Sequence, residues 1–570
     1  MAVLVPTGSI PSIWSRHRSK VLLALVGLLA VFCYAPALRA YFVQDDFTLL
    51  ALARQLHEPA LPFWHDHFPG SLFFRPLGIF VWWLTVAWFD NAPRGHYAVN
   101  LLLHLGVVLA LYTLLQRLRR DAPLNVAWAA AYAVHPLAIG TALWLSDRFD
   151  LIATGFSLLA LAAAAGYAQR PRLRSLAAVL GCVLLAFMGK EIAIVGAIAA
   201  AALIALPNRA WPLSAAQRWT AVAAIGLLTV AWLGYRQALL VEPQNALRYA
   251  GPLVAMFQKG IALWLRIGFE YLFLDPRQTI WVTILLVAAA LLLAIAVVAT
   301  ARGEGWKRPG ALGVAASVLV LLFLPGPTQA PVVSVSTSDL TAQTFWFDLI
   351  GESRLYHLSL AGLMVGLMLL TTPLASAIKR RGHPALLAAG AALGLMLVAW
   401  IPASHALAHD FARRTREQIG PLSAANAAIA KLPLPERRCQ IYLLDATSIW
   451  GLADIGDPTI KASSPAPSRL EHCLVLTERT PWGNFVRTGS IDANDYRPMQ
   501  ALEHFGKPVP WLTLGSLQVA YLNLDADIDS RSMDGAFFLE YRDGAFVDVT
   551  GQVRDGTRPV HFFNARPAEK

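Results

Sequence analysis

The sequence predicts an all-α polytopic membrane domain followed by a small soluble domain with an α+β or mostly β fold. Apolar runs, each long enough to cross a hydrocarbon core of about 30 Å, recur between residues 21 and 402. The last part of the chain is mixed and polar and contains no such run. We therefore divide the chain into a membrane domain, residues 1–402, and a soluble domain, residues 403–570.

The composition supports the membrane assignment. Of the 570 residues, 56% are hydrophobic and only 15% are charged, whereas a soluble protein of this size needs many more polar residues to cover its surface. The net charge of +11 does not indicate nucleic-acid binding, because the basic residues sit in short loops between apolar runs. We therefore expect membrane lipids, and no nucleic acid, among the partners.

The distribution of Lys and Arg predicts the orientation in the membrane. Six short basic segments are assigned to the cytoplasm by the positive-inside rule, and they are residues 16–20, 117–120, 170–174, 209–218, 302–308 and 379–381. The apolar runs between them give about eleven transmembrane helices, which we expect at residues 21–40, 96–116, 123–143, 149–168, 174–189, 191–207, 218–236, 279–300, 310–325, 355–373 and 383–402. With eleven spans and the basic segments inside, the N-terminus is expected in the cytoplasm and the soluble domain on the opposite, periplasmic side. We therefore expect a multi-pass protein of the inner membrane.

Two further apolar stretches, residues 76–89 and 261–273, do not fit this alternation of charge. Their Trp, Tyr and charged residues are typical of the headgroup boundary, so we expect both to be juxtamembrane helices on the periplasmic face. The alternative, that one of them is a true span, stays open.

Two adjacent carboxylates, Asp45 and Asp46, directly follow the first predicted helix. Their mutual repulsion and partial burial would raise their pKa values, so that one of them could act as a general base near neutral pH. The same residues also fit a helix N-cap before residues 47–57, and this reading stays open at this point.

Several other polar groups fall on the same predicted face of the membrane. They are Asp147, Arg148, Lys190, Glu191, Glu352, Arg354 and Tyr356. Cations close to an acidic base suit a reaction in which a phosphate leaves. We therefore expect a site at this face.

Seven short motifs carry a family resemblance through their order along about residues 20–400. They are Asp45-Asp46, Phe74-Arg75-Pro76-Leu77, His96-Tyr97-x-x-Asn100-x-x-x-His104, Ala133-Val134-His135-Pro136, Trp144-Leu145-Ser146-Asp147-Arg148-Phe149-Asp150, Gly189-Lys190-Glu191 and Arg354-Leu355-Tyr356. This order resembles the GT-C superfamily of integral-membrane glycosyltransferases, most closely the transmembrane-and-TPR O-mannosyltransferases and their bacterial relatives. Lipid A aminoarabinose transferases and protein O-mannosyltransferases look similar more distantly. The chain departs from the pattern in lacking a TPR-like repeat and in having His357 where relatives often have Pro.

The resemblance implies transfer of a sugar from a polyprenyl-phosphate donor to a hydroxyl of an acceptor glycan, lipid or protein. It implies that Asp45 is the base of an inverting reaction and that Asp46 supports it. Donor-binding residues would be Lys190, Arg354 and Tyr356, with Arg148 and Asp147 as further candidates. Supporting residues would be Arg75, His96, Asn100, Glu191 and Glu352. The family is not uniform in its use of a divalent metal, so a metal stays open, and no other cofactor is expected.

In the soluble domain, the sequence predicts helix at the start and strands at residues 440–445, 473–477, 517–524, 536–541 and 545–549. Arg542-Asp543-Gly544 is a turn signal that predicts a hairpin between the last two strands. Cys439 and Cys473 would form a disulfide if the domain is extracytoplasmic. Two other functions stay open for the chain, a transporter or flippase of a lipid-linked sugar and a non-catalytic scaffold.

Overall fold

A computed structural model of the chain gives the fold. It describes residues 13–43, 45–67, 73–118, 122–205, 212–240, 357–358, 360–366, 368, 384–436, 439–446, 456–470, 473–477 and 535–558.

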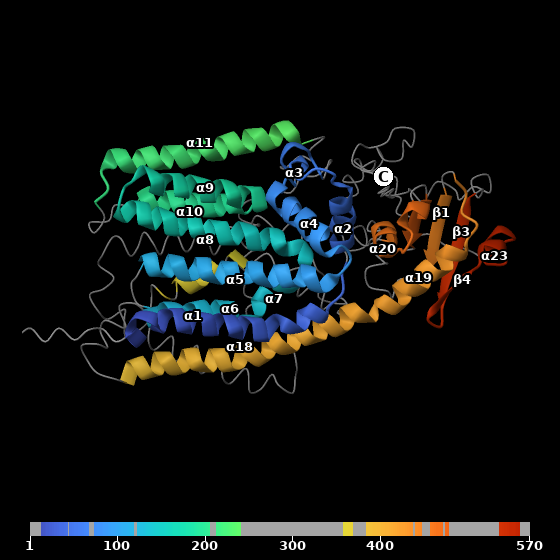
Figure 1. Ribbon diagram of the computed structural model, residues 1–570, viewed down its shortest axis with the longest axis horizontal. Helices are drawn as coiled ribbons and strands as arrows, with labels where there is room; N and C mark the ends of the chain where they lie inside the picture. The colour runs from blue at the N-terminus through green and yellow to red at the C-terminus, as the bar shows by residue number, and fades with distance from the viewer. Residues whose placement is uncertain are drawn as a thin grey trace, which may run out of the picture.

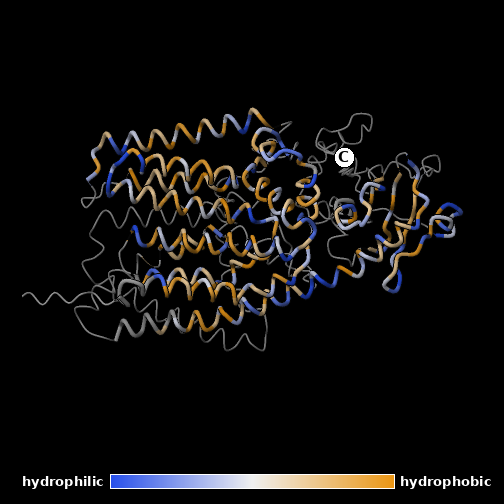
Figure 2. Tube along the Cα trace, in the orientation of Figure 1, coloured by the Kyte–Doolittle hydropathy of each residue, from blue (hydrophilic) through white to orange (hydrophobic). Residues whose placement is uncertain are grey.

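The larger part of the described chain is a bundle of long helices that lie side by side (Figure 1). These helices are α1 (Ile13–Tyr34), α5 (Pro93–Leu118), α6 (Ala122–Ala133), α8 (Arg148–Gln169), α9 (Leu173–Gly189), α10 (Ala193–Ala205), α11 (Ala215–Leu239) and the first part of α18 (Pro384–Glu417). Hydrophobic residues dominate these helices, as Figure 2 shows. The bundle is therefore built for an apolar surrounding.

Four segments in the described ranges are long and apolar enough to cross a membrane. They are Lys20–Arg39, Pro93–Leu118, Leu145–Gln169 and Ala215–Leu239, and the bent pair Leu124–Ala133 and Pro136–Leu143 gives a fifth if it is one span. The expectation of a mostly helical membrane protein is confirmed at this level. The expected helices at 279–300 and 310–325, nine of the 19 residues of the one at 355–373, and the juxtamembrane run at 261–273 lie outside the described residues.

Two apolar helices of the bundle meet at a break at Pro136. Helix α6 is followed by the 3-10 turn η2 (Pro136–Ala138) and by α7 (Ile139–Leu143), and the two parts are bent by 54°. Proline cannot donate the backbone hydrogen bond that would continue the helix. Polar side chains from neighbouring helices bind the carbonyl groups near the break. His104 Nε2 lies 3.0 Å from Ala133 O, and Ser404 Oγ lies 2.8 Å from Val134 O. The Tyr34 hydroxyl lies 3.0 Å from His135 O, and Asn100 Nδ2 lies 3.0 Å from Thr141 O.

Short helices cross one end of the bundle. They are α2 (Asp45–Gln55), α3 (Leu61–Trp64) and α4 (Pro76–Phe89), and α2 packs against α4. The apolar stretch expected at 76–89 is thus a helix of 14 residues that begins with Pro76, a residue favoured in the first helical turn. At about 1.5 Å per residue it is shorter than a hydrocarbon core.

Helix α18 connects the bundle to the C-terminal part of the chain (Figure 1). Its 34 residues correspond to a length of about 50 Å, which exceeds the thickness of a hydrocarbon core. The domain boundary expected at residue 402 therefore lies inside a continuous helix. Beyond it, the Thr415 hydroxyl accepts a hydrogen bond from Tyr41 N at 3.0 Å, which holds the projecting part of α18 beside the chain that leads into α2.

The C-terminal part contains a four-stranded sheet with helices α19 (Ile419–Lys431), α20 (Gly456–Ser463) and α23 (Thr550–Arg554). The strand order is β2 (Cys473–Thr477), β1 (Cys439–Leu444), β3 (Ala536–Arg542) and β4 (Ala545–Asp548). The β1 strand pairs in parallel with both neighbours, whereas β3 and β4 form an antiparallel hairpin. Its turn residues Asp543 and Gly544 have φ angles of 52° and 84°, as a two-residue hairpin requires. The strand expected at 517–524 lies outside the described residues.

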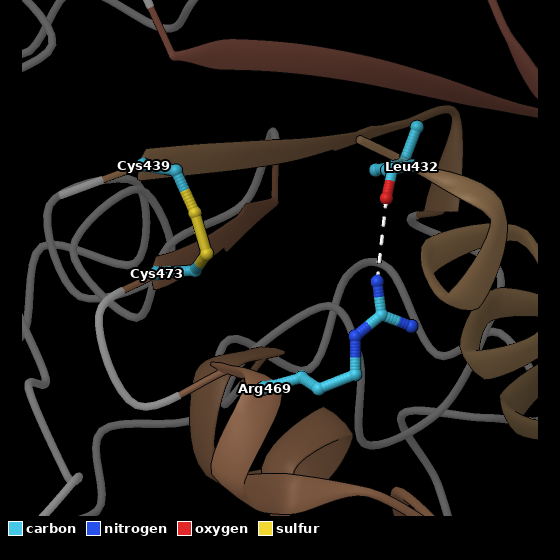
Figure 3. The surroundings of a disulfide bond; sticks show 4 residues. All are labelled: Leu432, Cys439, Arg469 and Cys473. Carbon is cyan, nitrogen blue, oxygen red and sulfur yellow. Dashed lines mark hydrogen bonds between the residues drawn. A yellow bond between two sulfur atoms is a disulfide. The ribbon is translucent and has the colours of Figure 1, made fainter. Parts of the chain in front are cut away.

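A disulfide joins the first residues of β1 and β2 (Figure 3). The Cα atoms of Cys439 and Cys473 are 4.4 Å apart and pair in register across the two strands. Nearby, Arg469 donates from its two terminal nitrogens to Ala430 O at 3.0 Å and to Leu432 O at 3.4 Å. These contacts fix the end of α19 against the segment that leads into β2.

Candidate functional site

The adjacent carboxylates Asp45 and Asp46 lie in the first turn of α2 but differ in their surroundings. Asp46 is completely buried. Its Oδ2 accepts a hydrogen bond from Val43 N at 3.0 Å, and its Oδ1 accepts from Ser146 N at 2.8 Å and from Ser146 Oγ at 2.6 Å. Asp45 is exposed. Consecutive helical residues point in directions about 100° apart, which explains how one carboxylate faces the protein and the other faces outward.

Asp46 therefore anchors the start of α2 to a distant part of the chain. Ser146 belongs to the 3-10 turn η3 (Leu145–Asp147), which directly precedes α8. An N-cap side chain accepts hydrogen bonds from amide groups inside the first helical turn. The Asp46 carboxylate instead accepts from Val43 N, which lies just before the helix.

Burial raises the pKa of the Asp46 carboxyl from 3.8 to about 7, although the hydrogen bonds from Ser146 and Val43 favour the charged form. The folded pKa lies above the unfolded one, so the folded state binds the additional proton between pH 3.8 and about 7. The free energy of unfolding should therefore fall as pH rises through this range. Thermal unfolding of the detergent-solubilised protein across this pH range measures how the free energy of unfolding depends on pH. This dependence should be weaker in Asp46→Asn. An unchanged slope in that variant would contradict the assignment.

Lys190 and Asp150 form a buried ion pair. The distance between Lys190 Nζ and Asp150 Oδ2 is 2.6 Å, and the two side chains are only 10% and 3% exposed. Asp150 lies in the first turn of α8, where a negative charge is favourable, and Lys190 follows the last residue of α9. Sequence reasoning placed Lys190 at the site but missed Asp150 as its partner, although Asp150 stands in the same motif as Asp147.

The next residue, Glu191, forms a second ion pair with Arg75. Arg75 Nη2 lies 3.1 Å from Glu191 Oε2, and Phe74 N donates to Glu191 Oε1 at 3.3 Å. The Arg75 guanidinium also lies over the ring of Phe149, 5.2 Å from its centroid. Arg75 and Glu191 thus hold the start of α4 close to Lys190, the neighbour of Glu191 in the chain.

The close approach of α8 and α9 depends on Gly189. A Cβ atom at this position would lie 2.9 Å from the backbone nitrogen of Ala153, a distance that a folded protein does not tolerate. The glycine therefore lets the end of α9 touch α8, and this contact brings Lys190 within reach of Asp150.

Arg148, the first residue of α8, lies in the interior of the protein. Its guanidinium is fully buried and lies 4.1 Å from the centroid of the Trp82 ring. It donates to Thr85 Oγ1 at 2.9 Å and reaches His96 O at 3.5 Å. These partners hold α8 against α4 and α5, and the donor-binding role that the resemblance implies for Arg148 stays a prediction.

The expected supporting residues of α5 are buried. His96 Nε2 lies 2.8 Å from Asp90 O, at the end of α4. Asn100 binds Thr141 O in α7, the helix that precedes η3. Asp147 is buried in η3, between the residue that binds Asp46 and Arg148. His96 thus links α5 to the end of α4, and Asn100 links α5 to α7.

His357 is held in the membrane domain by two hydrogen bonds. Its Nε2 lies 2.7 Å from the Tyr132 hydroxyl, and its Nδ1 lies 2.8 Å from Thr141 Oγ1. The expected donor-binding residues Arg354 and Tyr356 and the supporting residue Glu352 precede it and lie outside the described residues. In the part of the chain that the structure describes, no group of three or more His, Cys, Asp or Glu side chains is arranged to hold a metal ion.

The chain matches no protein-family model and no curated protein. Among solved structures it is similar to ArnT from Cupriavidus metallidurans bound to undecaprenyl phosphate, with 14% identity, coverage of 83% of this chain and 91% of that chain, and a TM-score of 0.39. It is also similar to the oligosaccharyltransferase of Archaeoglobus fulgidus in the apo form, with 12% identity, coverage of 83% and 66%, and a TM-score of 0.45. The chain spans 62% of the length of that oligosaccharyltransferase in its complex with Zn and sulfate. Similarity at this level assigns neither a family nor an activity.

Proposed function

We propose that this protein is a glycosyltransferase of the GT-C type. It moves a sugar from a polyprenyl-phosphate donor to a hydroxyl group of an acceptor at the outer face of the inner membrane. The donor enters from the lipid, and the acceptor is a glycan, a lipid or a protein. The order of motifs in the sequence supports this proposal, and so does the geometry around the acidic pair.

The observation that carries the proposal is the different environment of two neighbouring carboxylates. Asp46 is buried and fixed by Val43 and Ser146, whereas Asp45 is exposed at the start of the same helix. A general base must be accessible to substrate and held in a defined position. Asp45 meets the first condition directly and the second through Asp46, so we assign Asp45 as the base and Asp46 as its support.

In the proposed reaction, the Asp45 carboxylate accepts the proton of the acceptor hydroxyl. The acceptor oxygen forms a bond to the anomeric carbon, and the bond from that carbon to the phosphate oxygen breaks. The electron pair of the broken bond stays on the polyprenyl phosphate. Attack from the side opposite the leaving group inverts the configuration at the anomeric carbon.

Lys190 is proposed to bind the departing phosphate together with Arg354, with Tyr356 lining the lipid-phosphate pocket. The Lys190 ammonium has three N–H donors, of which one is directed at Asp150. Its remaining donors can serve a phosphate while Asp150 keeps the side chain in position. A fixed cation stabilises the charge that develops on a leaving phosphate, and such interactions are usually large contributors to catalysis.

A second candidate function is transport of the lipid-linked sugar across the membrane. The broken helix at Pro136 favours it, because discontinuous helices are typical of transporter binding sites. Side chains of the protein hydrogen-bond the carbonyl groups at this break, and such an arrangement also suits a static structural element.

A transfer assay distinguishes the two functions. The purified protein in lipid vesicles is incubated with radiolabelled polyprenyl-phosphate hexoses and with membrane and periplasmic fractions as the source of acceptor. The proposal predicts that label leaves the lipid fraction and that free polyprenyl phosphate accumulates. Movement of intact labelled lipid between leaflets, with no label leaving the lipid fraction for any donor, would contradict the proposal and support transport.

A further inference from the structure

Helix α2, which carries Asp45 at its start, is enclosed between the two parts of the protein. It packs against α4 of the membrane domain on one side and against α20 of the C-terminal domain on the other (Figure 1). Its apolar residues are almost fully buried, and these are Phe47, Leu49, Leu50, Leu52 and Ala53. A helix that is buried on most of its surface depends on all of its neighbours. The C-terminal domain therefore supplies one wall of the surroundings of α2.

Arg54, in the last turn of α2, contacts both neighbours. Its Nε and Nη2 donate to Asp90 Oδ1 at 3.2 and 2.8 Å, at the end of α4. Its Nη1 donates to Ala462 O at 3.3 Å, in the last turn of α20. The carbonyl groups of a last helical turn lack partners within the helix and carry partial negative charge, so a guanidinium is a favourable partner for them. Arg54 thus joins three helices through one side chain.

The ion pair with Asp90 is not the important part of this arrangement. The Asp90 side chain is 71% exposed and that of Arg54 is 25% exposed, and surface ion pairs usually contribute little to stability. The pair instead orients the guanidinium, so that its Nη1 faces α20. The contact with Ala462 links segments that are 408 residues apart in the sequence.

Helix α20 transmits this contact to the rest of the C-terminal domain. The Asn426 amide in α19 donates to Ser463 Oγ at 2.9 Å, at the end of α20. Helix α20 also packs against β2 and α19. A displacement of α20 from α2 would therefore move the C-terminal domain as well.

We infer that Arg54 is a positioning residue that fixes the C-terminal domain on α2, and that this domain thereby forms part of the binding site for the acceptor. The inference rests on the proposed function. Arg54 follows Asp45 by nine residues, which is roughly 14 Å along a helix, so it does not take part in the chemistry itself. The exposed Asp45, which we propose meets the acceptor, lies at the other end of the helix that α20 contacts.

We expect Arg54→Gln to weaken the binding of the acceptor and to leave the rate of the chemical step unchanged. We expect the acceptor KM to rise about tenfold, which corresponds to the loss of about 1.4 kcal/mol of binding, while kcat and the donor KM stay within about twofold. The readout is the initial rate of label transfer as the acceptor-containing fraction is titrated. Asp90→Asn is the matched control. It removes the charge, but its amide oxygen can still accept from the Arg54 guanidinium and keep Nη1 directed at Ala462, so its acceptor KM should rise less than that of Arg54→Gln.

Hydrogen exchange of the amides in α20 provides a readout that does not depend on activity. Exchange at residues 456–463 should be faster in Arg54→Gln than in the wild type and unchanged within α19. Faster exchange with an unchanged acceptor KM would overturn the role in acceptor binding. Unchanged exchange would overturn the positioning role. If the wild type transfers no sugar, the proposed function fails, and the exchange result still decides whether Arg54 fixes the domain.

Discussion

Replacement of Asp45 by Asn is expected to reduce the rate of sugar transfer by roughly 10²- to 10⁴-fold, the usual contribution of a positioned general base. The amide cannot accept the proton of the acceptor hydroxyl. Because Asp45 is exposed, the variant should unfold at nearly the same temperature as the wild type. Initial rates of label transfer from a polyprenyl-phosphate sugar, measured together with thermal unfolding in the same detergent, check both parts.

Asp46→Asn is the matched control, and it should behave in the opposite way. Both oxygens of Asp46 accept hydrogen bonds from backbone N–H groups, those of Val43 and Ser146. An amide must place its own NH₂ against one of these donors and leave it unsatisfied, which costs about 1–3 kcal/mol of stability. Transfer should decrease less than in Asp45→Asn when compared at a temperature where both are folded. A wild-type rate in Asp45→Asn would refute its assignment as the base.

Replacement of Lys190 by Met should have the largest effect on stability. The substitution leaves the carboxylate of Asp150 buried without its cation, and breaking a buried ion pair from one side costs about 3–5 kcal/mol. Transfer should be lost as well, because the proposed phosphate contact is removed. The loss of stability is measured as the shift of the unfolding transition in detergent.

A double variant separates the structural role of Lys190 from its role in the reaction. In Lys190→Met with Asp150→Leu, apolar side chains replace both charges, and such replacements are often neutral or stabilising. We expect the double variant to recover most of the lost stability and to remain unable to transfer sugar. Recovery of transfer along with stability would mean that Lys190 acts only through its pair with Asp150.

The membrane helices could be predicted because their signal is strong and local. The runs at 96–116, 149–168 and 218–236 coincide with α5, α8 and α11, since long apolar stretches must be helical in lipid. The sequence did not show that α18 continues past residue 402 as one helix. A change from apolar to polar composition marks where a helix leaves the membrane, but a helix does not need to end there.

The site was only partly predictable. The sequence indicates Asp45, Asp46 and Lys190 as a group, but burial separates the two carboxylates, and burial depends on which way α2 faces. Arg148 shows the same limit, because a cation at the start of a helix can point to the phosphate side or into the protein. Here it points at Trp82 and Thr85. The contact of Arg54 with α20 had no signal in the sequence, since its partner is a backbone carbonyl.

The break at Pro136 constrains how the nascent chain assembles in the membrane. The carbonyl groups of Ala133, Val134 and His135 are bound by side chains of α5, α18 and α1, and Ser404 is synthesised 270 residues after Val134. Unpaired carbonyls in hydrocarbon cost several kcal/mol each, so this segment cannot rest stably in lipid when it first leaves the translocation channel. The Val134 carbonyl therefore gains its side-chain partner only when α18 arrives beside a segment made long before it.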